Sequence, residues 1–216
     1  MIARPRALIF DWDNTLVDSW PTIHEALNKT LEAMGHAPWT LEESKERVRL
    51  SLRDSFPLLF KDRWEEARRI YLDAFLAVHI ERLTVLPGVE TLLDRLQGDG
   101  LYLAVVSNKT GPILRREAET LGWNRYFSRL VGATDAAADK PDAAPVHMAL
   151  EGSGIAAGRD VWFVGDTAVD MQCALKSGCL PVLLGPSDPA GTEFAEFKPA
   201  LAFRDGEGLF LHLRTL

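Results

Sequence analysis

Five short runs of almost wholly apolar residues, spread along the chain, constrain its fold more than any other feature. They occupy positions 7–10, 101–106, 130–133, 161–164 and 181–184. A strand with one face in water alternates apolar and polar residues, whereas a strand covered on both faces does not. The runs therefore predict the strands of a parallel sheet that is buried between helices.

The stretches between these runs carry apolar residues at helical spacing. Leu92, Leu93 and Leu96 share one face of such a helix, and glycines at 98, 122 and 178 follow the ends of three helical stretches. Strands that alternate with helices over short connections are typical of α/β proteins. We expect an α/β fold with a Rossmann-like, three-layer core built on a parallel sheet.

One long segment, from about Asp18 to Leu83, contains no convincing strand. Ser19 and Thr40 are expected to cap its first two helices, since Glu43 follows Thr40 at capping-box spacing, and a third helix is expected to start at Asp62. We therefore predict an all-helical cap domain at 18–84, inserted into a core formed by 1–17 and 85–216. The two crossings, near positions 17 and 85, would form a hinge.

Composition excludes several classes of function. The chain has 216 residues, with 24 Lys and Arg against 31 Asp and Glu and a net charge of −7. An acidic surface repels nucleic-acid backbones, and no apolar run is long enough to span a membrane. Cys173 and Cys179 lack the spacing and partners of a zinc site and are expected to be free thiols. These features predict a cytoplasmic protein with no nucleic-acid polymer and no membrane as partner.

Polar side chains follow the predicted strands, and ligands of open parallel sheets bind beyond the carboxyl ends of the strands. Carboxylates that meet there need a cation to offset their repulsion, and their oxygens suit Mg²⁺. A hydroxyl and an ammonium group facing such a cation form a phosphate receptor. The candidate site residues are Asp11 and Asp13, Ser107 and Asn108, Lys140, and Asp166 and Asp170.

These residues stand in motifs that carry a family resemblance. Asp11-x-Asp13-x-Thr15, Ser107-Asn108, Lys140-Pro141 and Gly165-Asp166-Thr167-x-x-Asp170 resemble, in order, the four motifs of the haloacid dehalogenase superfamily. Three longer stretches, at 10–19, 86–89 and 165–171, look most like its phosphoglycolate phosphatase-like branch. The helical insertion after the first motif resembles the C1-type cap of that superfamily.

The resemblance implies a role for each aspartate. Asp11 would attack phosphorus and form an aspartyl-phosphate, and Asp13 would act as general acid for the leaving alcohol and then as base for water. Mg²⁺ would bind the Asp11 carboxylate, the Asp13 backbone carbonyl and Asp166. Asp170 would be either a further ligand or a group that holds a metal-bound water or Lys140.

The remaining motif residues would bind the phosphoryl group. Ser107 would donate to a phosphoryl oxygen with help from backbone N–H groups near Asn108, and Lys140 would neutralise the nucleophile and the transition state. Lys109 is a rival ammonium group, and Asp139 could pair with Lys140 instead. The chain departs from the family at Asn14, where Gly is usual, but Asn tolerates the positive φ that this turn requires.

The motifs predict a Mg²⁺-dependent phosphomonoester hydrolase. The presence of Asp13 favours phosphate esters, because a halide leaving group needs no proton. The expected partner is a small-molecule phosphate ester, led by a small anionic one such as 2-phosphoglycolate. The alternatives are a phosphomutase of the β-phosphoglucomutase type and a non-catalytic phosphoryl-sensing protein. The sequence specifies no oligomeric state.

Two groups of residues carry a functional and a structural interpretation. Arg47, Arg49 and Arg53 could clamp a substrate carboxylate, although such a cluster is more often a solvated helix face. Trp12 lies between the catalytic carboxylates in sequence, but its side chain should point away from theirs, so packing is its expected role.

Overall fold

The computed structural model describes residues 2–48 and 50–216, and it has a six-stranded sheet at its centre. Every neighbouring pair in this sheet is parallel, in the order β5-β4-β1-β6-β7-β8. All five predicted strands are present, and the predicted α/β fold is confirmed. The strands are β1 (Ala7–Phe10), β4 (Tyr102–Thr110), β5 (Arg129–Ala133), β6 (Val161–Gly165), β7 (Leu180–Leu184) and β8 (Leu201–Phe203).

Helices cover both faces of the sheet. Along β1, Leu8 and Phe10 pack on one face and Ala7 and Ile9 on the other, and all four side chains are buried. The first face is covered by α5 (Val89–Gly98), α6 (Gly111–Thr120) and α9 (Gly206–Leu213), and the second by α7 (Ala144–Leu150) and α8 (Ala168–Ser177). Both faces of β1 are apolar because both are core, which is why the run does not alternate.

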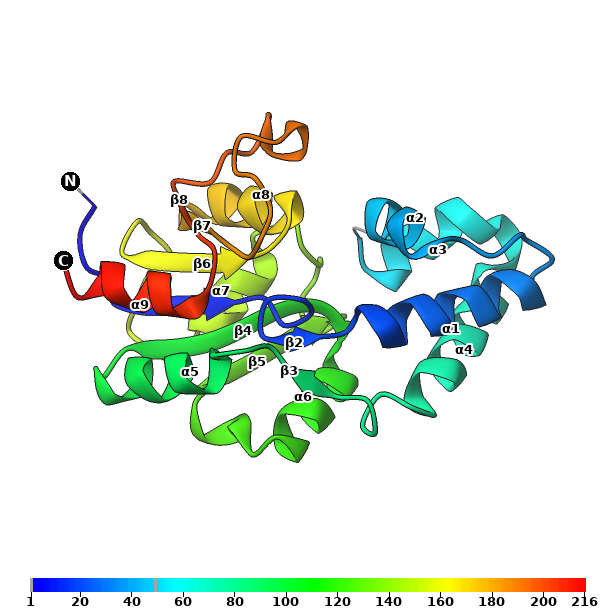
Figure 1. Cartoon of the computed structure of the whole chain (residues 1–216), viewed down its shortest axis with the longest axis horizontal. Coiled ribbons are helices and arrows are strands. Elements are labelled where there is room, and N and C mark those ends of the chain that lie inside the picture. The colour runs from blue at the N-terminus through cyan, green and yellow to red at the C-terminus, as the bar shows by residue number, and fades with distance from the viewer. Residues whose placement is uncertain (1, 49) are drawn as a thin grey trace.

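A second group of helices lies to one side of this core (Figure 1). We call residues 18–84 the helical insert. It leaves and rejoins the core through β2 (Val17–Asp18) and β3 (Thr84–Val85), which pair antiparallel. Its helices are α1 (Trp20–Ala33), α2 (Leu41–Arg47), α3 (Leu52–Phe60) and α4 (Trp64–Leu76).

The insert differs from its prediction in three details. Ser19 occupies the N-cap position of α1, but its side chain makes no capping hydrogen bond. Thr40 caps α2 as expected, since its Oγ1 accepts from the Glu43 N–H at 3.1 Å. The α3 helix was not predicted, because Pro57 lies inside it and interrupts the helical signal. The helix expected to start at Asp62 starts instead at Trp64, after a short 3₁₀ turn.

Two elements at the C-terminal end, β8 and α9, were also missed by the sequence analysis. The β8 strand has only three residues, none of them fully buried, so its sequence lacks a buried apolar run. Cys173 and Cys179 are free and buried, as expected. Within the described residues, no helix combines the length and the apolar character needed to cross a membrane.

Candidate active site

The residues that the sequence analysis singled out converge at the carboxyl end of the sheet. Asp11 and Asp13 follow β1, which is the central strand at the point where the strand order reverses, and Asp166 follows the neighbouring β6. Ser107 and Asn108 lie in the last part of β4. These residues and Lys140 line one cavity, which extends to the helical insert.

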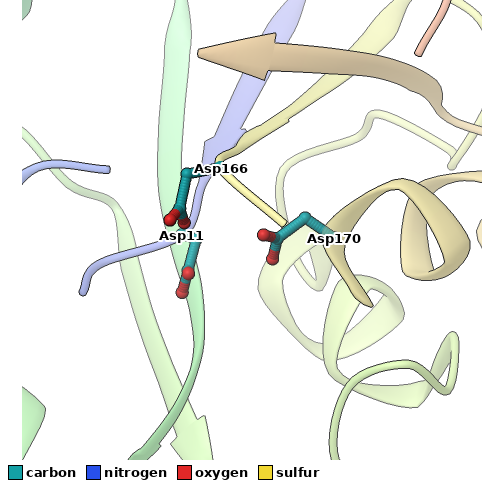
Figure 2. Close-up of side chains that lie close together, drawn as sticks. All are labelled: Asp11, Asp166 and Asp170. Carbon is teal, nitrogen blue, oxygen red and sulfur yellow. The ribbon is translucent and has the colours of Figure 1, made fainter. Parts of the chain in front are cut away.

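Three carboxylates form the acidic part of this site (Figure 2). One oxygen from each of Asp11, Asp166 and Asp170 lies within 4.8 Å of the other two. Asp170 comes from the first turn of α8, four residues after Asp166, so the cluster joins the end of β1 to the connection between β6 and α8. Asp170 is wholly buried and Asp11 nearly so, which keeps most of this charge out of water.

Local backbone geometry allows these carboxylates to meet. A Cβ atom on Gly165 would lie 2.3 Å from Cγ of Asp170, so only glycine leaves room for that side chain. Asn14 has a φ of 62°, the left-handed conformation expected for its turn. The next residue, Thr15, donates from its hydroxyl to Asp166 Oδ1 at 3.1 Å and so orients that carboxylate.

Lys140 bridges two members of the cluster. Its Nζ lies 2.6 Å from Asp11 Oδ1 and 2.8 Å from Asp170 Oδ1, with the side chain 3% exposed. The competing pair with Asp139 does not form, because Asp139 accepts instead from Arg53 at 2.8 Å. Asp170 is held on its other oxygen by the backbone N–H and hydroxyl of Thr167. The structure thus places Asp170 where it orients Lys140.

The cluster carries more negative than positive charge. Burial raises the pKa of Asp11 to about 7; Lys140 lowers it and Asp170 raises it further. Burial also raises the pKa of Asp166 well above its ordinary value, with Asp170 and Asp11 adding to the effect. Three hard oxygen donors with one ammonium group between them fit a divalent cation such as Mg²⁺, whose charge would offset the excess.

A second buried lysine, Lys109, lies beside Asp13. Lys109, considered above as a rival of Lys140, has its Nζ 2.7 Å from Asp13 Oδ1 and 2.6 Å from Glu117 Oε2. Burial alone would lower the pKa of Lys109, but Asp13 and Glu117 outweigh burial and raise it. Lys109 is therefore a fixed cation that holds the Asp13 carboxylate in place.

Glu117 is the residue of this group that the sequence analysis missed. Its side chain is 1% exposed and also accepts from Trp12 Nε1 at 2.7 Å, while His79 Nδ1 lies 3.0 Å from its other oxygen. A signal was present in the sequence. Glu117 lies four residues after Ile113 and three after Leu114, so it falls on the apolar face of the predicted helix. A carboxylate on a buried face needs partners.

The other candidates lie as follows. Ser107 Oγ accepts from the Lys109 N–H at 3.1 Å, and Asn108 Nδ2 donates to the Lys140 carbonyl at 3.1 Å, which ties β4 to the Lys140 loop. Trp12 is fully buried and packs edge-on against Trp123, with 5.4 Å between ring centroids. Trp12 therefore packs in the core, as expected.

The two described arginines of the cluster, Arg47 and Arg53, take separate partners. Arg47 pairs with Glu43 and lies over the Trp39 ring at 4.6 Å, whereas Arg53 is engaged by Asp139. Neither is among the residues that line the cavity. Arg49 lies outside the described residues.

A parallel sheet with acidic groups and a lysine at its carboxyl edge, beneath a helical insert, is the architecture of an α/β enzyme whose site lies beyond the ends of its strands. A model of the haloacid dehalogenase-like hydrolase family matches residues 8–183. The chain belongs to this family. It is an enzyme of the phosphatase kind and falls in the phosphoglycolate phosphatase-like branch.

Similar proteins agree with this assignment. A phosphoglycolate phosphatase of Pseudomonas fluorescens is 30% identical over 211 residues, covering 93% of this chain and 77% of the relative. One from Psychrobacter arcticus is 27% identical and covers 95% and 94%. The crystal structure of a predicted phosphatase from Clostridium acetobutylicum has a TM-score of 0.86 at 22% identity, covering 99% and 100%, and shows the same fold.

Proposed function

We propose that the protein is a Mg²⁺-dependent phosphomonoester hydrolase that acts through an aspartyl-phosphate on Asp11. The observation that carries this proposal is the position of Lys140, whose ammonium group contacts Asp11 and Asp170 inside a cluster of three carboxylates. A cationic group beside a buried carboxylate can balance the charge that a phosphoryl group brings, and phosphoryl transfer depends mainly on positioning and charge.

In the first half-reaction, an oxygen of Asp11 attacks phosphorus and the bond from phosphorus to the alcohol oxygen breaks. Asp13 enters this step protonated, so its ion pair with Lys109 must open when the ester binds. Asp13 then gives its proton to the leaving oxygen, so that the alcohol departs neutral. In the second half-reaction, Asp13 takes a proton from water, which attacks the phosphoryl group and regenerates Asp11. Ser107 and Asn108 donate to the phosphoryl oxygens, and Lys140 neutralises Asp11 and the transferred group.

The cation has a defined place in this proposal. Asp11 and Asp166 would hold it with the backbone carbonyl of Asp13, and Asp170 would either join them or keep Lys140 in place. When bound, Mg²⁺ supplies positive charge to the phosphoryl oxygens and orients the ester. The excess of carboxylates over ammonium groups in the cluster supports such a role.

We further propose that the helical insert, at 18–84, is a cap that moves relative to a core made of 1–17 and 85–216. The insert has an apolar cluster built mainly from its own residues, to which Ile113 of α6 is added from the core. It joins the core through β2 and β3, which supports a hinge near Val17 and Val85. A cap of this kind closes over the substrate and excludes water. A cytoplasmic location stays a prediction from composition.

A phosphate-release assay tests the function. Esters such as p-nitrophenyl phosphate and 2-phosphoglycolate, the latter suggested by the names of the relatives, would be assayed with Mg²⁺ and with a chelator. The chelator should abolish turnover, and Asp11→Asn should lower it about 10³-fold or more, because the amide cannot act as the nucleophile. The exposed Asp73→Asn, on α4, is the matched control and should keep full activity.

The products separate the alternatives. A hydrolase releases inorganic phosphate, whereas a phosphomutase converts a sugar phosphate into its isomer without net release. A non-catalytic phosphoryl-sensing protein would do neither. If no ester in the panel released phosphate, or if Asp11→Asn kept near-normal rates, the proposed function would be wrong.

A further inference from the structure

A line of polar contacts leads from the interior of the core to Asp13. It begins at Glu117, which lies on α6 and whose Oε2 is 2.6 Å from Lys109 Nζ. The same ammonium group lies 2.7 Å from Asp13 Oδ1. Glu117 is therefore connected to the proposed general acid through one lysine, although it lies 104 positions further along the chain.

Glu117 acts from behind the cavity and not from inside it. Asp13 and Lys109 line the cavity, whereas Glu117 is not among the described residues that line it. The exposed fraction of the side chain falls from 19% at Asp13 to 5% at Lys109 and 1% at Glu117. Two further groups hold Glu117 in place: Trp12 Nε1 donates to its Oε2 at 2.7 Å, and His79 Nδ1 lies 3.0 Å from its Oε1. Asp13 can thus turn toward an ester while Glu117 stays fixed.

The proposed function requires the contact between Asp13 and Lys109 to open at every turnover, since Asp13 must reach the leaving oxygen. A buried ammonium group that loses its carboxylate partner is strongly destabilised. Lys109 keeps a partner when this contact opens, because Glu117 remains 2.6 Å from its Nζ. The Phe75 ring, whose centroid is 5.2 Å from the same Nζ, adds a weaker attraction for the cation.

We propose that Glu117 is a positioning residue for the reaction: it neutralises and holds Lys109, and so lets Asp13 leave that lysine for the substrate. If Glu117 lost its charge, the ammonium group would be balanced by Asp13, and the ion pair between them would tighten. Asp13 would then be held away from the leaving oxygen. This inference rests on the proposed phosphatase function.

Glu117→Gln tests the inference, because it removes the charge and keeps the size of the side chain, and its amide oxygen can still accept from Trp12. Two esters report on Asp13. The alcohol of benzyl phosphate needs a proton as it leaves, whereas p-nitrophenolate is a stable anion and needs none. We expect kcat/KM, which reports the steps up to departure of the alcohol, to fall about tenfold or more for benzyl phosphate and less than about threefold for p-nitrophenyl phosphate.

A second substitution separates positioning from a structural role. If Glu117→Gln acts by leaving Asp13 bound to Lys109, then adding Lys109→Met should release Asp13. The double variant should hydrolyse benzyl phosphate about threefold or more faster than Glu117→Gln alone, a non-additive result typical of residues in direct contact. A structural role predicts that the second substitution lowers activity further or leaves it unchanged. Glu119→Gln, on the same helix with a side chain 63% exposed, is the control and should affect neither ester.

The double variant also keeps the test open if Glu117→Gln does not fold, because it removes both charges and leaves neither one buried alone. A circular dichroism melt would show which variants are folded. In the double variant, the ratio of kcat/KM for benzyl phosphate to that for p-nitrophenyl phosphate should stay within about threefold of the wild-type ratio. A larger fall in this ratio would overturn the inference.

The two proposals fail in different ways. Equal losses for both esters in folded Glu117→Gln, or a folded double variant no faster than the single one, would refute the positioning role and leave the phosphatase function standing. Absence of turnover with every ester, in the folded wild-type protein with Mg²⁺, would refute the phosphatase function itself.

Discussion

The two ends of the cavity differ in the side chains that line them, which are charged at one end and apolar at the other. At the end formed by the sheet, Asp11, Lys140 and Asp170 contact one another through charged atoms. At the end formed by the helical insert, Trp20, Leu72 and Phe75 present apolar surface. In the proposed function, the first end binds the phosphoryl group, which every ester shares, and the second faces the alcohol, which differs between esters.

This difference has a kinetic consequence. A change at the sheet end should slow all esters by the same factor, because it acts on a group common to them. A change at the insert end should alter the ratio of kcat/KM between esters. It should leave hydrolysis of the aspartyl-phosphate, the step that all esters share, almost unaffected. The predictions below test this separation.

Among the predictions below, the largest effect is expected from Lys140→Met. Loss of the ammonium group removes the charge that balances Asp11, and kcat/KM should fall by about 10²–10³-fold, as when one electrostatic stabiliser of a transition state is removed. Benzyl phosphate and 2-phosphoglycolate should lose activity by equal factors. The assay would be run beside a circular dichroism melt, to separate loss of catalysis from loss of fold. A change in the ratio of the two esters would contradict the separation of the two ends.

Glu117→Leu should have the next largest effect, on stability. It leaves Trp12 Nε1 and the buried ammonium of Lys109 with fewer partners, and removal of one member of a buried ion pair costs about 3 kcal/mol or more. Urea unfolding would measure this free energy. Glu119→Leu, on the same helix but with a side chain 63% exposed, is the control and should change it by less than about 0.5 kcal/mol.

The acidic cluster predicts a pH dependence of stability in the metal-free protein. The pKa of Asp11 is raised from its ordinary value to about 7, so the folded state holds this proton more tightly than the unfolded state. Stability from this group is therefore greatest at low pH and declines between about pH 4 and pH 7. Mg²⁺ should raise the Tm more as pH increases, because it binds the deprotonated carboxylates.

Melting curves with Mg²⁺ and with a chelator, at several pH values, would check this prediction. Asp11→Asn should flatten the decline and give a metal-free protein that is more stable than the wild type at neutral pH. An increase in Tm with Mg²⁺ that is the same at every pH would argue against a cation held by these carboxylates.

The smallest effect is expected from Arg53→Met. Arg53 reaches from the helical insert to Asp139, whose side chain is 1% exposed, and its own side chain is 32% exposed. Loss of this pair should cost about 1 kcal/mol, between the values for surface and buried pairs. Urea unfolding is the measurement. Arg47→Met, within the insert, is the control. A shift in the ratio of kcat/KM for the two esters would mean that this pair also shapes the end of the cavity formed by the helical insert.

The core and the sheet end of the site were largely predictable from the sequence. The apolar runs predict strands because a doubly covered strand has no polar face, and Asp11, Asp13, Lys140 and Asp166 follow those strands at the edge where ligands bind. The capping box at Thr40 was equally local. Interactions over a few residues, or a repeating pattern of burial, can be predicted directly from the amino-acid sequence.

The helical end and the Glu117 group depended on tertiary structure. The α3 helix forms despite Pro57 because Phe56 and Phe60 gain burial in the insert, and propensity is a weaker force than burial. The sequence does not mark the apolar side chains that line the cavity from the helical insert either, since an amphipathic helix shows the same apolar stripe whether it faces a core or a cavity.

The amino-acid sequence thus determines that strands form, where they end and which charged groups follow them. Only the folded structure decides which partners those groups take: Lys109 pairs with Asp13 and Glu117, while Lys140 pairs with Asp11 and Asp170. The physical reason is that a buried charge is stabilised by whatever opposite charge lies within a few ångströms, and those neighbours come from segments far apart in the sequence.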